Sequence, residues 1–315
     1  MCDMKIRVGI MGLASIARRS LIPSFTKHAE FEVGRIASRN PELGCTYQEL
    51  LEDDSIDMIY CPLPTGLHFE WVRKAIAAGK HVLCEKSLAT TFNEVQTLVD
   101  EARVAGRFLM ESFQFRFHRQ NLYVKELLAE KAIGDLHHIV VRFGIPPFPE
   151  GDKNIRYSRA LGGGALLDNG AYTLKCASYL LGSGNLHVVG AMCGGAVPEL
   201  GSVDITGAIM LRSGDIAVHA AYGFDHYYQN GYEVWGSGGK ISTARAFTAR
   251  EDFDAPVVLE MKSGREIKTF RDDHFAGLLD YVSTSIANGD FETEYRECLE
   301  QARLLKEAYD CAFRR

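Results

Sequence analysis

The chain has 315 residues, of which 46% are hydrophobic and 24% are charged, enough for one large or two ordinary globular domains. Its net charge of −6 argues against a nucleic-acid or anionic-membrane partner, and no run of about 18 apolar residues could span a bilayer. The N-terminus lacks a signal-peptide layout, and the eight cysteines form no Cys-x-x-Cys pair. We therefore expect a cytoplasmic protein with reduced thiols and no bound metal.

The first part of the chain alternates strand and helix patterns. Residues 6–11 are a near-continuous apolar run, typical of a strand buried on both faces of a parallel sheet. Further strands are expected at 31–37, 56–60, 81–84 and 108–110, and helices at 15–28, 47–51, 67–78 and 92–105. This alternation predicts βαβ units and a doubly wound parallel sheet, which is a Rossmann domain.

Beyond residue 118 the pattern changes to longer strands with few helices between them. After a helix at 119–130, strands are expected at 136–145, 187–193, 204–211, 216–222, 231–235 and 257–261, and helices at 165–181, 275–288 and 293–313. Such an order predicts an α+β domain with a large open mixed or antiparallel sheet. We expect two domains, residues 1–118 and 119–315, with the last helix able to pack back on the first domain.

The first predicted strand leads into GLASIA at residues 12–17, a G-x-G-x-x-G pattern with two alanines. Gly12 permits the tight turn, Ala14 lets backbone amides approach a pyrophosphate, and Ala17 allows close packing of helix and strand. The helix that starts near Ser15 and Ile16 adds the positive end of its dipole. Gly12, Ala14, Ser15 and Ile16 are therefore predicted to bind a dinucleotide, although an ordinary small-residue turn is the alternative.

The end of the second predicted strand reads Ala37-Ser38-Arg39-Asn40. An acidic residue there would accept hydrogen bonds from the ribose hydroxyls of NAD. Arg39 can instead pair with a 2′-phosphate, and Ser38 can donate a hydrogen bond to it. This pattern favours NADP(H), and the alternative is a solvated arginine at a strand end.

CPLPTGLH at residues 61–68 follows the third predicted strand. Its two prolines fix an extended turn at the carboxyl edge of the sheet, where ligands bind in such folds. We therefore predict that Leu63, Pro64, Thr65 and His68 line the cofactor site. Thr65 could equally cap the next helix, and His68 could simply be exposed.

Glu85 and Lys86 follow the fourth predicted strand, at the edge where a nicotinamide would lie. A lysine there can hydrogen-bond a substrate oxygen and lower the pKa of a neighbouring acid. Both residues are predicted to contact the cofactor, and Lys86 is also predicted to be catalytic. An ordinary surface lysine is the alternative.

The segment GGGALLDNGAY at residues 162–172 combines three glycines with a helix start. The glycines let the backbone approach a ligand or another segment closely. Asp168 and Tyr172 are four residues apart and share one helix face. A tyrosine beside a cation can act as general acid toward a carbonyl oxygen. We predict that both are catalytic, although Asp168 could instead cap the helix or form a structural pair.

Over essentially its whole length the chain resembles the Gfo/Idh/MocA oxidoreductases. The resemblance rests on residues 9–17, 62–64, 85–86 and 162–172. Within that family the chain is most similar to NADPH-dependent C-3 ketoreductases of dTDP-linked deoxysugars, through the segments 143–147, 155–157, 161–168, 222–228 and 232–237. One departure is Ser87, because the family usually has proline after Glu-Lys, where it shapes the turn that presents the lysine.

The resemblance implies roles for individual residues. Lys86 would bind the substrate carbonyl or hydroxyl, Tyr172 would donate the proton, and Arg156 would contact the cofactor or substrate. The predicted activity is NADPH-dependent reduction of a keto group, at C-3, of a nucleotide-linked deoxysugar, in a cleft between the two domains. A dehydrogenase of free sugars, polyols or dihydrodiols, and a non-catalytic NADP-sensing regulator, stay open as alternatives.

The resemblance also implies a homodimer or homotetramer formed through the open sheet face. Ile205, Ile209 and Leu211 are expected to be exposed on that face, and large exposed apolar patches usually meet a partner. No short motif identifies the sugar, its nucleotide or the physiological direction of the reaction.

Overall fold

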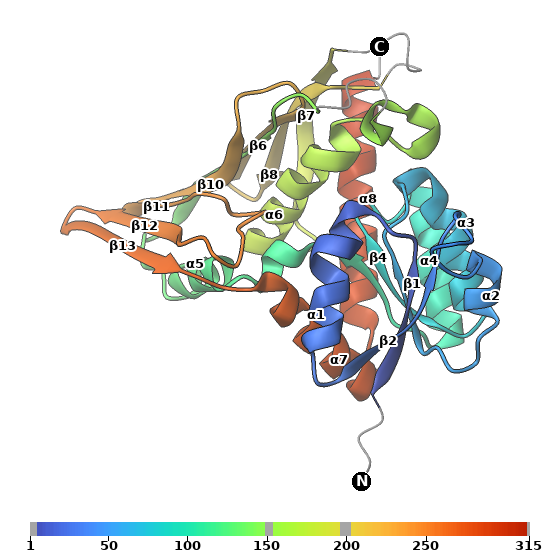
Figure 1. The fold of residues 1–315 in the computed structure, drawn as a ribbon. Coiled ribbons are helices and arrows are strands. Elements are labelled where there is room, and N and C mark those ends of the chain that lie inside the picture. The colour runs from blue at the N-terminus through green and yellow to red at the C-terminus, as the bar shows by residue number, and fades with distance from the viewer. Residues whose placement is uncertain (1–4, 149–153, 196–202, 314–315) are drawn as a thin grey trace. The chain divides into compact units, whose positions relative to one another are not determined.

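The computed structural model describes residues 5–148, 154–195 and 203–313. The chain divides into two compact units (Figure 1). Unit 1 comprises Met1–Ser112 and Phe275–Leu299, and unit 2 comprises Phe113–His274 and Glu300–Arg315. None of the helices in the described part of the chain has both the length and the apolar character needed to cross a bilayer.

Unit 1 is built on a parallel five-stranded sheet with the order β2-β1-β3-β4-β5. Its strands are β1 (Ile6–Met11), β2 (Phe31–Ala37), β3 (Met58–Cys61), β4 (His81–Glu85) and β5 (Leu109–Ser112). All residues of β3 and β5 are buried, as expected for strands covered on both faces. The predicted doubly wound parallel sheet is confirmed.

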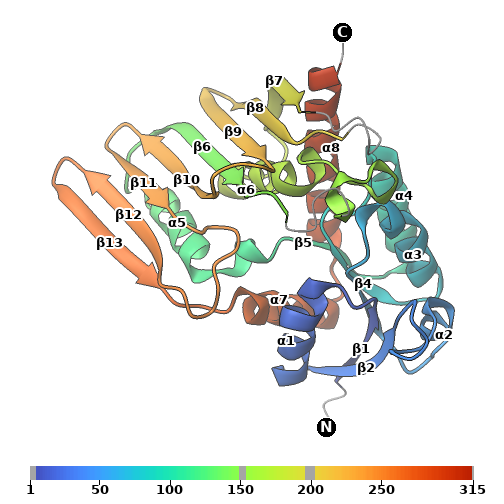
Figure 2. The ribbon, with the colours of Figure 1, turned by 45° about the horizontal axis from the view of Figure 1, so that its top comes forward.

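Helices cover both faces of this sheet (Figures 1 and 2). They are the π-helical turn η1 (Ala17–Leu21), α1 (Ile22–Lys27), α2 (Tyr47–Leu51), α3 (Thr65–Ala77), α4 (Phe92–Ala105), α7 (His274–Asn288) and α8 (Glu292–Phe313), the last of which continues into unit 2. Local sequence sets their ends. Thr91 and Glu94 form a capping box at the start of α4, and Gly106, with φ of 61°, ends it.

Unit 2 contains an eight-stranded sheet with the order β13-β12-β11-β10-β6-β9-β8-β7, in which β6 and β9 are parallel and the other pairs are antiparallel. The strands are β6 (Leu136–Gly144), β7 (His187–Gly194), β8 (Thr206–Ser213), β9 (Ile216–Gly223), β10 (Gln229–Gly236), β11 (Gly239–Thr243), β12 (Ala255–Met261) and β13 (Gly264–Phe270). The expected large mixed sheet is therefore confirmed.

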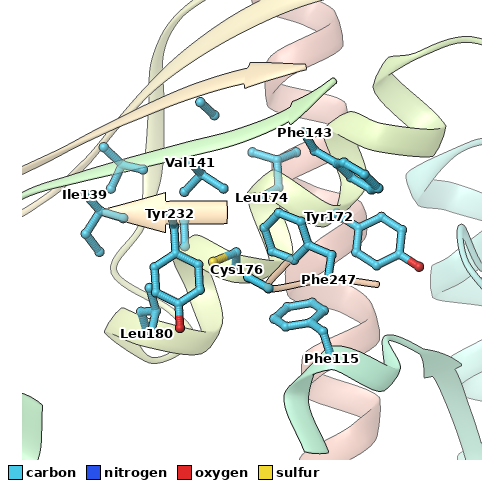
Figure 3. Packing of buried hydrophobic residues seen from close by; sticks show 14 of the residues in the cluster. Phe115, Ile139, Val141, Phe143, Tyr172, Leu174, Cys176, Leu180, Tyr232 and Phe247 are labelled. Atoms are coloured by element: carbon cyan, nitrogen blue, oxygen red, sulfur yellow. The ribbon is translucent and has the colours of Figure 1, made fainter. Parts of the chain in front are cut away.

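Helices α5 (Arg119–Ala129) and α6 (Ala171–Leu181) pack on one face of the large sheet. Shorter helical turns are η2 (Gln114–Phe117), η4 (Ile155–Tyr157), η5 (Arg159–Leu161) and the π-helical η6 (Leu166–Gly170). The core between this sheet face and the helices is rich in aromatic rings (Figure 3). The helix expected over 165–181 is therefore present, with a π-helical first part.

One expectation about the sheet was wrong, and two of its strands were not predicted. Ile209 and Leu211 are not exposed, because they point from β8 into the core and are each 1% accessible, and Ile205 is partly buried against the same core. Alternate residues of neighbouring strands face outward instead, among them Met192, Met210 and Trp235. The strands β11 and β13 were not predicted: β11 is short, and β13 is a polar edge strand whose residues are exposed up to Phe270.

Candidate active site

The turn after β1 has the geometry that the dinucleotide fingerprint requires. Gly12 has φ of 110°, and its N–H donates to the carbonyl of Ala37 at 2.9 Å. A Cβ at Gly12 would lie only 3.0 Å from Cδ2 of Leu63 and 3.7 Å from the Tyr47 hydroxyl. Ala14 and Ile16 are partly buried and Ser15 is exposed where the helix begins. A close backbone approach at a helix N-terminus fits a pyrophosphate.

Ser38 and Arg39 directly follow Ala37, the last residue of β2, whose carbonyl accepts the Gly12 N–H. Arg39 is exposed, and the Ser38 hydroxyl oxygen accepts a hydrogen bond from the Asn40 N–H at 3.1 Å. Burial raises the pKa of Tyr47, and the positive charge of Arg39 opposes that rise. Tyr47 was not predicted as a site residue, because nothing but its helix position distinguished it.

The loop after β3 leads into α3 and also packs on the turn after β1. Pro64 occupies the cap position of α3 and Thr65 is the first helical residue, so Thr65 does not cap the helix. Leu63 is buried against Gly12. Pro64 and Thr65 are partly buried, and Leu63 is the residue of this loop that packs on the turn after β1.

His68 lies beneath this loop rather than on its surface. Its ring is fully buried, with Nε2 2.6 Å from the carbonyl oxygen of Leu63 and Nδ1 2.8 Å from that of Ser87. Burial lowers its pKa, while the hydrogen bonds with the carbonyl oxygens of Ser87 and Leu63 act in the opposite direction. Cys61 and Cys84 lie close to it, but the two carbonyls already occupy both ring nitrogens. The sequence left surface exposure of His68 as an alternative, and that alternative was wrong. His68 can affect a bound cofactor only through the loops of Leu63 and Ser87.

Glu85 and Lys86 follow β4 at the carboxyl edge of the sheet. The Tyr60 hydroxyl donates to Oε1 of Glu85 at 2.8 Å. Burial raises the pKa of Glu85, while this hydrogen bond and the charge of Lys86 counteract the rise. Lys86 is partly buried, and its peptide bond to Ser87 is cis. The Leu88 N–H donates to Oε1 of buried Glu111 at 3.0 Å.

Tyr172 lies in unit 2, at the edge of the aromatic cluster. Its ring centroid is 5.3 Å from that of Phe113, 5.1 Å from that of Phe143 and 5.7 Å from that of Phe247. Figure 3 shows its hydroxyl pointing away from the packed aliphatic core. That oxygen lies 3.3 Å from Nε2 and 3.4 Å from Oε1 of Gln114. Gln114 was not predicted as a site residue.

Asp168 and Arg156, also in unit 2, form an ion pair through Arg156 Nε. The Arg156 guanidinium lies 4.8 Å from the centroid of the Phe148 ring. The triple glycine allows the chain to fold back here, since the Gly163 N–H donates to Ser158 at 2.9 Å. The structural pairing considered for Asp168 is therefore present, and the closely approaching segment is the chain's own backbone.

The predicted residues thus fall into two sets. Unit 1 brings together the residues expected to hold a dinucleotide, with Lys86 at the same sheet edge. Unit 2 brings together Arg156 and Asp168, and it places Tyr172 beside Gln114.

Comparisons with known proteins identify the family. A model described as "Oxidoreductase family, NAD-binding Rossmann fold" matches residues 6–113, and one described as "GFO/IDH/MocA C-terminal domain" matches residues 121–242. The chain is 42% identical over 270 residues to dTDP-3,4-didehydro-2,6-dideoxy-alpha-D-glucose 3-reductase of Saccharopolyspora spinosa, covering 82% of this chain and 80% of that protein. The chain belongs to the GFO/IDH/MocA oxidoreductase family. The resemblance found in the sequence is confirmed.

Other family members extend the similarity over nearly the full chain. A reductase of the same name from Actinomadura kijaniata is 35% identical, covering 95% of this chain and 93% of that protein. The structure of a 3-ketoreductase from Actinomadura kijaniata in complex with NADP and TDP-benzene matches with a TM-score of 0.91 and 34% identity, covering 98% of both chains. Similar structures of that 3-ketoreductase carry a tyrosine replaced by phenylalanine, or a lysine replaced by alanine or glutamate.

Proposed function

We propose that this protein is an NADPH-dependent ketoreductase that reduces the C-3 keto group of a dTDP-linked deoxysugar. The observation that carries the proposal is its similarity, over 98% of both chains, to a 3-ketoreductase in complex with NADP and TDP-benzene. The turn at Gly12, the exposed Arg39 and the position of Lys86 at the carboxyl edge of the parallel sheet support it from this chain's own residues.

Residues of unit 1 would hold the cofactor. Backbone amides at Gly12, Ala14, Ser15 and Ile16 would face the pyrophosphate, and Arg39 with Ser38 would bind the 2′-phosphate. Leu63, Pro64, Thr65 and Glu85 would border the rest of the dinucleotide, with Lys86 and Arg156 as further contacts. When bound, the reduced nicotinamide supplies a hydride to the carbonyl carbon of the substrate.

Two side chains would act on the substrate oxygen. Tyr172 donates its hydroxyl proton to the alkoxide as it forms, and the Lys86 ammonium stabilises the same negative charge. Asp168 would orient substrate hydroxyls, and its ion pair with Arg156 would hold its carboxylate in one position. The solved variants of the Actinomadura relative replace a tyrosine and a lysine, the two residue types of this pair.

Two assays test the function. NADPH oxidation is measured with a panel of dTDP-linked 3-keto deoxysugars, and NADP+ reduction is measured with free sugars, polyols and dihydrodiols. We expect turnover with the nucleotide-linked ketones, and loss of most of it in Tyr172→Phe. Turnover confined to the free compounds would support the dehydrogenase alternative. Binding of NADPH without turnover on either panel would support the regulator.

We also propose that the protein self-associates through the outer face of the large sheet and works in the cytoplasm. Met192, Met210 and Trp235 are exposed on this face, which is opposite α5 and α6. The seven cysteines among the described residues are free, in keeping with a reducing compartment. Light scattering should give a dimer or tetramer, and Met210→Glu should weaken it. We further propose that the boundary between the two domains lies near residue 118, close to Ser112, where the first stretch of unit 1 ends.

A further inference from the structure

The loop that carries Lys86 is held by buried side chains on both of its sides. We propose that His68 and Glu111 are positioning residues that fix the Lys86 ammonium for catalysis, an inference that rests on the proposed function. Neither residue contacts the substrate in this proposal. His68 contacts the backbone of Ser87, and Glu111 contacts the backbone of Leu88. The loop lies after β4, which has β3 on one side and β5 on the other.

His68 holds the loop from the β3 side. It belongs to α3, the helix that follows β3, and its Nδ1 lies 2.8 Å from the carbonyl oxygen of Ser87. His68 is fully buried and Ser87 is 1% exposed, so water does not compete for this contact. The other ring nitrogen lies 2.6 Å from the carbonyl oxygen of Leu63. One imidazole therefore connects the Lys86 loop to the loop that packs on Gly12.

Glu111 holds the loop from the β5 side. It lies in β5 directly opposite Cys84 of β4, and its Oε1 accepts the N–H of Leu88 at 3.0 Å. Glu111 is 4% exposed and Leu88 is 1% exposed. A hydrogen bond from a backbone N–H to a buried carboxylate is stronger than one between neutral groups. The two residues after Lys86 are thus each held, one by its carbonyl and one by its N–H.

Ser87 explains why this chain needs side-chain contacts here. A proline after Lys86 would restrict the backbone through its own ring. Serine has no such ring, so the conformation of the loop depends more on the contacts that surround it. The contacts of His68 and Glu111 supply that restriction from outside the loop.

The contacts of His68 with Ser87 and with Leu63 can be removed one at a time. The ring places one nitrogen against each carbonyl oxygen, whereas the amide of asparagine or glutamine has a single nitrogen that can donate. The amide nitrogen of asparagine falls near the position of Nδ1, and that of glutamine near the position of Nε2. H68N therefore keeps a donor for Ser87, whereas H68Q keeps one for Leu63. If the Ser87 contact positions Lys86, H68Q should lower kcat more than H68N does.

The experiment compares H68N, H68Q, E111A and E111Q with the wild type and with K86A. The control is H81Q, because His81 also contacts a backbone group, the Phe108 N–H at 2.9 Å, but at the start of β4. We expect H68Q and E111A to lower kcat about 10- to 100-fold while the Kd for NADPH stays within about twofold. E111Q keeps an acceptor for Leu88 and should recover most of the loss. H81Q should change the unfolding temperature without changing kcat.

A double-mutant cycle separates positioning from a general structural effect. If His68 and Glu111 act through Lys86, H68Q and E111A should cause no further loss of kcat in the K86A background. An equal loss with and without Lys86, or wild-type kcat in both single variants, would overturn the inference. If H68Q does not fold, E111A and E111Q decide alone. Wild-type kcat in K86A would instead remove the role of Lys86 from the proposed function.

Discussion

The side-chain amide of Gln114 lies against the hydroxyl of Tyr172, with Nε2 at 3.3 Å and Oε1 at 3.4 Å from the phenolic oxygen. Both residues are buried in unit 2, and Gln114 Nε2 also lies 3.4 Å from the carbonyl oxygen of Phe247. The amide can donate to the phenolic oxygen or accept from its proton. Gln114 can therefore influence how readily the Tyr172 hydroxyl donates its proton in the proposed reaction.

Replacement of Gln114 should change turnover in a way that depends on hydrogen-bonding capacity. Q114L removes the donor, and since one hydrogen bond contributes about 1 kcal/mol, kcat should fall about five- to tenfold. Q114E can only accept when ionised, so it should hold the Tyr172 proton and lower kcat further at neutral pH. The comparison is a pH profile of kcat for the wild type and both variants. Equal kcat in all three would exclude a role for Gln114.

Arg39 should decide the preference between NADPH and NADH. It is exposed at the end of β2, where a 2′-phosphate would lie, and a hydrogen bond to a charged group is worth about 1.5–3 kcal/mol. R39A should therefore raise the KM for NADPH about 10- to 100-fold and leave the KM for NADH nearly unchanged. R35A is the matched control, because Arg35 is an exposed arginine on the same strand that pairs with Asp53. An equal effect of both substitutions would contradict the assignment.

The parts of the fold that were predictable have strong local patterns. β1 is a continuous apolar run because it is buried on both faces of a parallel sheet, and α4 has a capping box at one end and a glycine at the other. β13 has neither signal, since it is an exposed edge strand with Arg265, Glu266 and Lys268. A polar edge strand is hard to distinguish from a loop in a single sequence.

A site residue was predictable only where a single local motif contained both the residue and the structural feature that requires it. Gly12 was found because a tight turn between strand and helix requires such a residue. Glu111 and Gln114 were missed because their partners are 23 and 58 positions away along the chain. The sequence suggested surface exposure as the alternative for His68, because burial between two loops depends on tertiary packing rather than on helix position.

Two buried imidazoles should make unit 2 sensitive to mild acid. The rings of His118 and His274 lie edge to face with centroids 5.9 Å apart, and burial together with the neighbouring His118 lowers the pKa of His274 to about 3. Burial also lowers the pKa of His118. Below the ordinary histidine pKa of about 6.5, the unfolded chain therefore binds protons that the folded chain does not.

The free energy of unfolding should thus be level above about pH 6.5 and fall as the pH drops, by about 1.4 kcal/mol per unit for His274. At pH 5 the loss from this residue alone would be about 2 kcal/mol. Urea denaturation at several values between about pH 5 and 7 measures the slope, and H274Q should reduce it by about one proton. His81, whose pKa burial lowers to about 4, adds its own slope in unit 1, so H81Q serves as a comparison. The same slope in H274Q as in the wild type would contradict this account.

The triple glycine should be essential at its second position for a steric reason. A Cβ at Gly163 would lie 2.7 Å from the carbonyl carbon of Arg156 and 2.8 Å from the carbonyl oxygen of Ser158, and backbone atoms cannot rotate away from it. G163A should therefore cost about 1–3 kcal/mol of unfolding free energy and shift Arg156 relative to Asp168. G190A is the control, because a Cβ at Gly190 meets nothing within 4 Å and its φ is compatible with alanine. Urea denaturation of both variants measures the difference. Because the strain lies beside the Asp168 ion pair, G163A should also lower kcat, whereas equal unfolding midpoints for G163A and G190A would show that the segment yields to the added methyl group.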